Sequence, residues 1–229
     1  MEQQEINQTI SQDEAQKKQT NSLSRFVYSV LMTFAIVFVV AVFFGRIVYF
    51  PIKVKGASMQ PTLNALGSNV CDTVYACAPR TISRGDIVVF DATNYANVSD
   101  EDKLFIKRAI GLPGDTIYFA TNGIVKNGKI YYDIFVNGVK IEEDYTKEPM
   151  WHNAASASFE KTKFFNEYVL TQKPIKLEAN EYFLLGDNRN NSTDSRILGK
   201  IKKKDFVGKV VLQIKANQTI FEALIQKIF

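Results

Sequence analysis

An uninterrupted apolar run near the start of the chain limits its folds more than any other feature. Residues 26–44 contain no charged side chain, and the apolar character continues beyond Arg46 as far as Phe50. A helix needs about 20 such residues to cross the hydrocarbon core of a bilayer. The long side chain of Arg46 can carry its charge to the headgroups. The run therefore predicts one transmembrane anchor over residues 25–50, with Pro51 ending the helix.

Two other interpretations of this run are weaker. A buried core helix is usually shorter and carries polar positions, and a cleaved secretory signal has a short apolar region followed by small residues. Val42, Phe43 and Phe44 offer no such small pair. The basic residues that flank the run are equal in number, with Lys17, Lys18 and Arg25 before it and Arg46, Lys53 and Lys55 after it. The positive-inside rule therefore leaves the orientation open.

The segment before the anchor and the segment after it differ in character. Residues 1–24 are polar and rich in Gln, Asn, Ser and Thr, which predicts a solvated tail. Beyond Phe50 there is no sustained helical period except in the amphipathic tail 218–229. The domain at 51–217 is therefore predicted to be mainly β, with an irregular excursion at about 142–178.

Short β-branched and aromatic segments supply the predicted strands of this domain. They lie at 52–55, 87–90, 103–110, 116–119, 181–185 and 206–214. Asn127-Gly128 and Asn137-Gly138 each stand between further strand formers. This pattern predicts two hairpins, because a type I′ turn needs positive φ at both central positions.

The composition excludes several classes of partner. Hydrophobic residues make up 46% of the chain, and the net charge of +4 comes from scattered basic residues. No basic stripe with interleaved aromatics points to nucleic acid. Cys71, Cys77 and His152 are too few for a zinc site, so neither metal nor cofactor is expected. A disulfide between the two cysteines is feasible outside the membrane, and two free thiols are the equal alternative.

The stretch 56–63, GASMQPTL, places a single serine on a turn of small residues directly after a predicted strand. We interpret Ser58 as a nucleophile, which requires a base to activate it. His152 is the only histidine, but it lies in the irregular excursion between Trp151 and Asn153. A lone histidine in a loop is more often a surface residue, so we do not expect it to be the base.

Lys107 is the better candidate for the base. It stands on an apolar strand, and strand alternation puts Phe105, Lys107 and Ala109 on one face. Burial disfavours the ammonium form of lysine and can lower its pKa from ~10.4 toward 7–8. The neighbouring Arg108 points the other way and can remain charged. The lysines at 200–204 form a solvated cluster and are not candidates.

A third polar stretch, 186–196, follows the strand at 181–185 and reads GDNRNNSTDSR. A polar surface loop is the ordinary interpretation. However, Asp194 and Arg196 could form a buried pair, and the Ser192 hydroxyl could hold the lysine amine. Such supporting groups fix a catalytic side chain within the tolerance that catalysis requires.

Together, these stretches resemble one family. GASMQPTL, then RGDIVVF with IKRAIGLPGD, then GDNRNNSTDSR followed by VGKVV, all behind an anchor, are similar to bacterial type I signal peptidases. These are membrane-bound Ser/Lys endopeptidases, and the resemblance spans about residues 26–214. It implies an antiparallel β-sheet catalytic domain behind one N-terminal transmembrane helix. It also implies a single-pass protein of the bacterial plasma membrane, with a cytoplasmic N-terminus and an extracytoplasmic catalytic domain.

The resemblance assigns roles to the residues already singled out. It implies Ser58 as the nucleophile, Lys107 as the general base and Ser192 as the hydroxyl that orients the lysine. The supporting residues are the Asp194–Arg196 ion pair, a structural Arg108 and Gly186 at the start of the loop. The Ser58 N–H would form half of the oxyanion hole. Gly56 stands where some members carry a second hydroxyl donor, so the second donor here is a backbone N–H or is weaker.

The implied substrates are secretory preproteins with small residues at the −1 and −3 positions of the signal peptide. Ile52, Val54, Met59, Phe105 and Ile106 are the predicted walls of the shallow apolar pockets for those residues. The other expected partner is membrane lipid, and the protein is expected to be a monomer. The small-residue run 154–158 suggests a site of self-cleavage.

Two alternative functions remain at this point. A LexA-like self-processing protease shares the Ser/Lys chemistry but should carry a DNA-binding helical domain, for which residues 1–24 are too short. An inactive membrane-tethered binding module would have no need for a lysine on an apolar strand beside the Asp194/Arg196 loop.

Overall fold

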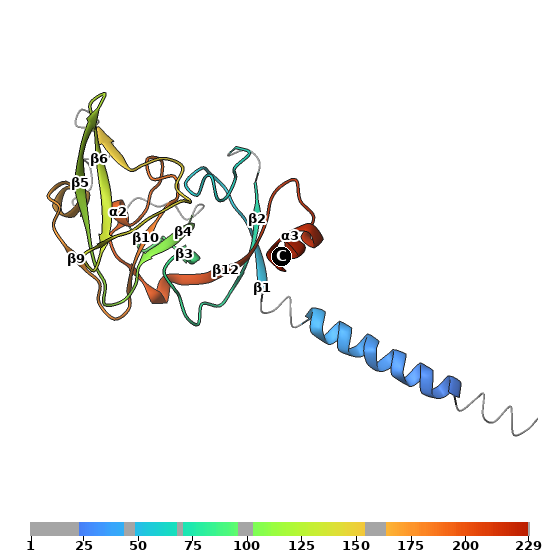
Figure 1. Ribbon diagram of the computed structural model, residues 1–229. Coiled ribbons are helices and arrows are strands. Elements are labelled where there is room, and N and C mark those ends of the chain that lie inside the picture. Colours follow the sequence, from blue (N-terminus) through green and yellow to red (C-terminus); the bar gives the residue numbers. More distant parts are fainter. Residues whose placement is uncertain (1–22, 44–48, 68–70, 96–102, 154–163, 229) are drawn as a thin grey trace, which may run out of the picture. The chain divides into compact units, whose positions relative to one another are not determined.

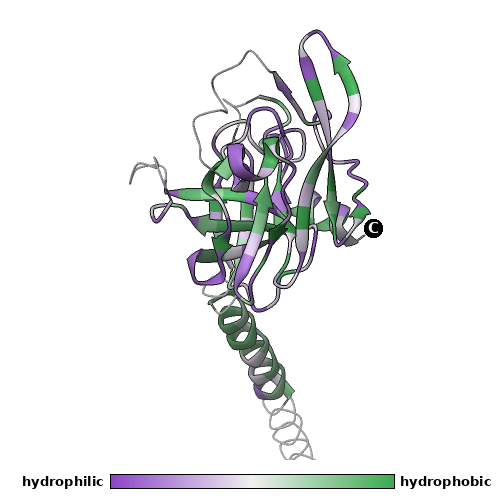
Figure 2. Ribbon diagram, turned by 90° about the vertical axis from the view of Figure 1, so that its left-hand side faces the viewer, coloured by the Kyte–Doolittle hydropathy of each residue, from purple (hydrophilic) through white to green (hydrophobic). Residues whose placement is uncertain are grey.

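The computed structural model describes residues 23–43, 49–67, 71–95, 103–153 and 164–228. The chain forms two compact units, Met1–Val48 and Tyr49–Phe229. The first unit contains the helix Leu23–Phe43, which has no buried residues and includes an 18-residue stretch with a mean hydropathy of 2.6. Figure 2 colours this helix green over most of its length. It is long and apolar enough to cross a membrane, whereas nearly all of the predicted tail lies outside the described residues.

The predicted end of the anchor at Pro51 is wrong. Residues Tyr49–Lys53 form a β-strand, β1, in which Pro51 pairs with Tyr75. Proline is tolerated in a strand at the edge of a sheet, because on the outer side no neighbouring strand needs a hydrogen bond from the N–H that proline lacks. β1 is such an edge strand, because β2 is its only neighbour in the sheet. The apolar side chains of Tyr49 and Phe50 therefore belong to the β unit.

The β unit contains a seven-stranded sheet in the order β1-β2-β12-β3-β4-β10-β11 (Figure 1). All of its paired strands are antiparallel. The strands are β1 (Tyr49–Lys53), β2 (Thr73–Cys77), β3 (Ile87–Asp91), β4 (Leu104–Gly111), β10 (Glu181–Leu185), β11 (Ile201–Lys202) and β12 (Phe206–Ile214). The sheet thus places β12, the last strand of the chain, between β2 and β3, and it places β4 beside β10.

A second sheet has the order β7-β6-β5-β9, with β8 paired to β6. Its strands are β5 (Thr116–Lys126), β6 (Lys129–Val136), β7 (Val139–Lys140), β8 (Trp151–Asn153) and β9 (Ile175–Lys176). Both Asn-Gly hairpins form as predicted, and φ is positive at each Asn and each Gly. The prediction of a mainly antiparallel β domain is confirmed.

The segment 142–178 is more regular than its sequence suggested. β8 and β9 add to the second sheet, and the π-helical turn η2 (Phe165–Leu170) buries Phe165 and Val169. His152 lies in β8 opposite Ile130 and is buried, so its predicted surface position is wrong. Its ring packs against Phe165. The predicted self-cleavage run lies outside the described residues.

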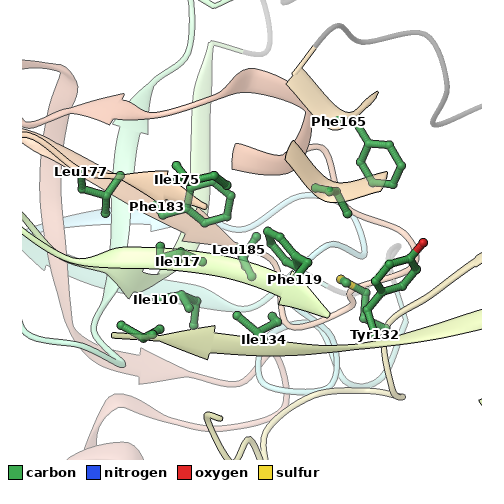
Figure 3. Packing of buried hydrophobic residues seen from close by; sticks show 13 residues of the cluster. Ile110, Ile117, Phe119, Tyr132, Ile134, Phe165, Ile175, Leu177, Phe183 and Leu185 are labelled. Atoms are coloured by element: carbon green, nitrogen blue, oxygen red, sulfur yellow. The ribbon is translucent and has the colours of Figure 1, made fainter. Parts of the chain in front are cut away.

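The largest hydrophobic core lies between the two sheets. Phe119 of β5 and Phe183 of β10 approach each other there, with a distance of 5.9 Å between the ring centroids (Figure 3). Gly111, which ends β4, permits this packing, because an added Cβ would lie 2.2 Å from Ile117 Cδ1. A smaller cluster formed by Val54, Met59, Leu63, Val74, Val89 and Ile106 lies at β1, β2, β3 and β4. This second cluster supports the segment that carries Ser58.

Short helices complete the unit. They are α2 (Ser195–Leu198), the 3-10 turn η3 (Lys203–Asp205) and α3 (Ile220–Ile228). α2 begins within the last residues of the third polar stretch, and Asp194 is its N-cap. α3 follows β12, as the amphipathic pattern of the tail predicted.

Candidate active site

Two asparagine side chains hold the segment that carries Ser58. Asn64 Nδ2 donates to the carbonyl oxygens of Val54 and Gly56, in each case at 2.9 Å. Asn188, from the third polar stretch, donates from its N–H to the Ser58 carbonyl and from Nδ2 to the Ala57 carbonyl, both at 3.0 Å. Four backbone oxygens around the serine are thereby fixed, which holds its side chain toward β4.

Lys107 on β4 meets that serine. Its Nζ donates to Ser58 Oγ at 2.9 Å and to the Ile106 carbonyl at 2.8 Å. Only 4% of the lysine is exposed, and its Nζ lies 5.1 Å from the centroid of the Phe105 ring. Two stretches that are 49 residues apart in the sequence therefore place a hydroxyl and an amine in contact.

Burial also changes the acidity of this lysine. The pKa of Lys107 is lowered from 10.5 to about 8, mainly because burial removes water from its ammonium group, and the positive charge of Arg196 acts in the same direction. The carboxylates of Asp194 and Asp187 act in the opposite direction. Desolvation prevails because removal of an ammonium ion from water outweighs attraction to carboxylates that are already paired with arginines.

The predicted Asp194–Arg196 pair is present and buried. Arg196 Nε donates to Asp194 Oδ1 at 2.8 Å, and Nη2 donates to Oδ2 at 2.7 Å. The Gly186 N–H also donates to Asp194 Oδ2, at 3.0 Å. Burial tends to raise the pKa of Asp194, but the Arg196 charge and these hydrogen bonds outweigh it and lower the pKa. Asp194 therefore stays ionised close to Lys107.

Gly186 and Ser192 are packed tightly against the segment that carries Ser58. A Cβ at Gly186 would lie 2.2 Å from Ser192 Oγ and 2.5 Å from the Ser58 carbonyl oxygen, so only glycine fits here. Ser192 Oγ is buried and makes no hydrogen bond of normal geometry to any described residue. The amine of Lys107 is held instead by the Ile106 carbonyl.

Arg108 makes a second buried ion pair that sequence reasoning missed. Its Nε donates to Asp187 Oδ1 at 2.8 Å and its Nη2 to Oδ2 at 2.5 Å. The Thr62 hydroxyl donates to the same Oδ2 at 2.5 Å. Through the Asp187 carboxylate, this network joins the segment that carries Ser58, the strand β4 and the third polar stretch. The sequence shows Asp187 next to Gly186, but it does not indicate that Arg108 is the partner of this carboxylate.

An open cleft of about 640 Å³ runs past Ser58 and Lys107. Ile52, Val54, Phe105 and Ile106, four of the five predicted pocket residues, line it. Met59 does not line the cleft. It is 1% exposed and packs in the cluster that supports the serine segment. Three exposed lysines, Lys53, Lys55 and Lys103, also border the cleft.

Gly56 lies in the cleft wall with a φ of 81°. A Cβ built there would meet nothing within 4 Å, so its backbone faces open space. The Ser58 N–H donates to no other backbone oxygen of the described chain. These two backbone positions are therefore open to a ligand in the cleft.

Other candidate residues do not contribute to this site. Cys71 and Cys77 are free thiols, and each is partly buried. His152 lines a separate small pocket with Tyr132 and Phe165. No group of His, Cys, Asp and Glu with the arrangement of a metal site exists among the described residues.

A family model and the sequences of known proteins point to the same family. A family model described as "Signal peptidase, peptidase S26" matches residues 24–214. Signal peptidase I P of Bacillus subtilis subsp. natto is 34% identical over 197 residues, covering 86% of this chain and 90% of that protein. Signal peptidase IB of Staphylococcus aureus strain Mu50 is 31% identical over 191 residues, covering 82% of this chain and 87% of that protein.

Among solved structures, a signal peptidase I from Enterococcus faecalis V583 matches with 23% identity and a TM-score of 0.37. The match covers 58% of this chain and 98% of that chain.

Proposed function

The chain belongs to the signal peptidase family, peptidase S26, and from this premise we propose that Ser58 and Lys107 carry out its cleavage reaction as nucleophile and general base. Members of the family are serine endopeptidases that remove signal peptides, and the apolar helix fits a single-pass membrane protein. The observation that carries the proposal is the 2.9 Å contact between Lys107 Nζ and Ser58 Oγ. It lies on the border of an open cleft, and the lysine is buried.

The reaction begins with proton transfer from the serine. When Lys107 is neutral, the same 2.9 Å distance lets the Ser58 hydroxyl donate to the lone pair of Nζ. The serine oxygen attacks the scissile carbonyl as the lysine takes its proton. A pKa of about 8 suits this role, because the neutral form is accessible near neutral pH while the amine remains basic.

The remaining steps use the same two groups. The developing oxyanion is stabilised by backbone donors, and the Ser58 N–H is available for this role because it donates to no backbone oxygen of the described chain. The protonated lysine passes its proton to the leaving amine, and an ester joins Ser58 to the signal peptide. Lys107 then activates a water molecule that hydrolyses this ester. The Asp194–Arg196 pair and the Asn188 bonds hold the two groups in register.

The cleft accounts for the proposed specificity. Val54 and Ile106 line the cleft but are almost fully buried, so each presents only a small apolar surface to it. Small side chains at −1 and −3 fit such surfaces, and the open backbone at Gly56 leaves room for an extended substrate. Ser192 is placed between Gly186 and Asp194, and we assign it a positioning role in the site.

A preprotein-processing assay in detergent tests the proposal. Ser58→Ala and Lys107→Ala should each abolish conversion of a signal-peptide-bearing preprotein to its mature form, while circular dichroism remains unchanged. Lys176→Ala, an exposed lysine on β9, is the matched control and should process normally. Full activity in either of the first two variants would refute the Ser/Lys mechanism.

A further inference from the structure

The C-terminal helix α3 presents its apolar side away from the protein. Ile220, Phe221, Leu224 and Ile225 are 50%, 69%, 44% and 43% exposed. Ala223, the residue between them, is only 4% exposed. At 100° per residue the four large side chains share one side of the helix, and Ala223 lies on another. An amphipathic helix usually buries its large apolar residues against the protein. α3 instead exposes them and turns the small Ala223 toward the protein.

α3 is a well-formed helix and not a frayed end. Thr219 and Glu222 form a reciprocal capping box at its start. The Thr219 N–H donates to Glu222 Oε2 at 2.7 Å, and the Glu222 N–H donates to Thr219 Oγ1 at 3.3 Å. On the polar side, Gln218 Nε2 donates to Gln226 Oε1 at 3.2 Å. The polar groups are thus paired within the protein, while the apolar side chains lack cover in the described chain.

The position of α3 in the β unit identifies what covers it. α3 packs against β12, which pairs with β2, which pairs with β1 (Figure 1). β1 is the strand at which the chain enters the unit, and five residues separate it from the helix Leu23–Phe43. A protein with such an anchor works at a bilayer surface. A helix with a polar side and a strongly apolar side binds in the plane of that surface.

We propose that α3 is an interfacial helix, whose exposed residues Ile220, Phe221, Leu224 and Ile225 insert into the headgroup region of the bilayer. α3 also borders a groove lined by Pro61 and Thr62, and Gln213 of β12 donates to the Thr62 carbonyl at 2.7 Å. A bilayer-bound α3 therefore fixes the distance between the bilayer surface and the segment that carries Ser58. The lipid contact does not depend on catalysis, whereas this effect on cleavage rests on the proposed function.

Depth-dependent fluorescence quenching in the full-length chain tests the lipid contact. Cys71 and Cys77 are replaced by Ala, and Phe221→Cys or Ile225→Cys carries an environment-sensitive fluorophore. Gln226→Cys, on the polar side, is the matched control. In phosphatidylcholine–phosphatidylglycerol vesicles, lipids with a nitroxide near the headgroup should quench the labels at 221 and 225 more strongly than the label at 226. A water-soluble quencher should show the reverse order.

Two outcomes would overturn the lipid assignment. Equal quenching at 221, 225 and 226 by the nitroxide lipids would mean that α3 does not touch the bilayer. Labels at 221 and 225 that escape both quenchers, and become accessible when the protein is diluted in lipid, would mean that a second copy of the chain covers α3. All these readouts are independent of peptidase activity, so failure of the proposed mechanism would not be mistaken for failure here.

The effect on cleavage needs its own comparison. The double variant Phe221→Gln, Ile225→Gln should lose activity toward a preprotein embedded in the same vesicles. It should keep wild-type activity toward a short soluble peptide that contains the cleavage site. Equal loss on both substrates would refute the role of α3 in positioning the site and would assign it to the stability of the fold.

Discussion

Burial and nearby carboxylates have opposite effects on the pKa of Lys107. Burial removes water from its ammonium group, whereas Asp194 and Asp187 attract the proton. Both carboxylates are already engaged by arginines, in the pairs Asp194–Arg196 and Asp187–Arg108. Their pull on the lysine is therefore reduced, and the pKa falls to about 8. The two ion pairs therefore place carboxylates near the lysine while its pKa still lies below the usual value.

The pH dependence of cleavage should report this pKa. Because only neutral Lys107 can act as base, kcat/KM should fall as the pH drops through about 8. Well below that value, each further pH unit should cost about tenfold in rate, as expected for one essential base. The measurement is kcat/KM on a signal-peptide substrate in detergent from pH 5 to 10.

His152→Phe is the control for this profile. His152 is a buried ring with no hydrogen-bond partner among the described residues, so phenylalanine replaces it with similar shape. The acid limb of the profile should not move in this variant. A limb that shifts or disappears would show that the histidine, and not the lysine, is the group that titrates.

The Arg108–Asp187 pair should contribute strongly to stability. Asp187→Asn leaves the buried guanidinium of Arg108 without a counter-charge, which typically costs about 3–5 kcal/mol of unfolding free energy. Asp133→Asn breaks the more exposed Lys140–Asp133 pair and should cost less than about 1 kcal/mol. Denaturant unfolding in detergent measures both variants. Similar small losses in the two would contradict the structural role given to Arg108.

At the scale of elements, the two Asn-Gly turns look alike in sequence but differ in context. Asn127 and Asn137 have φ values of 52° and 53°. Asn137 Oδ1 accepts from the Thr116 N–H at 2.9 Å, and its Nδ2 donates to Asp115 Oδ1 at 2.7 Å. Asn127 makes no side-chain hydrogen bond to any described residue. The second turn is therefore tied to the start of β5, while the first lies at an exposed tip.

This difference predicts unequal effects of the same substitution. Asn127→Ala and Asn137→Ala introduce the same backbone strain, but only Asn137→Ala leaves the buried Asp115 carboxylate with one bond fewer. We expect Asn137→Ala to be more destabilising by about 1–3 kcal/mol. Thermal unfolding of the two variants side by side is the measurement. Equal destabilisation would mean that the tie to β5 adds nothing.

Strands with a clear local pattern were predictable, and strands that depend on their partners were not. β10 and β12 have the predicted bounds, because each is an apolar segment bounded by turn formers. β2 was not predicted, because its five residues form too short a pattern by themselves and depend on pairing with β1 and β12 on both sides. β8, η2 and β9 were missed for the same reason. Their regular structure comes from the neighbouring β5 and β6 and not from their own residues.

For the whole molecule, the orientation across the membrane remains a prediction. The flanking charges tie, but large domains translocate largely regardless of such charges. Signal peptides are removed after export, so we expect the β unit outside and the N-terminus in the cytoplasm. In a background with Cys71→Ala and Cys77→Ala, Lys176→Cys should react with an impermeant maleimide on intact cells. Ser11→Cys should react only after permeabilisation, and the opposite pattern would reverse the topology.

The sequence by itself determined the long apolar helix and the β class of the domain, and it singled out Ser58 and Lys107, the two groups that we propose react. Each rests on a local pattern: a long apolar run, alternating strands with Asn-Gly turns, a serine on a turn and a lysine on an apolar strand. The tertiary structure decided which groups support them. Asn188 and Asp187 stand in an ordinary polar stretch, and the pairing of β10 with β4 brings that stretch to Ser58 and Lys107. Local patterns report the environment along one strand, whereas hydrogen-bond partners 49 to 131 residues apart meet only once the sheet has formed.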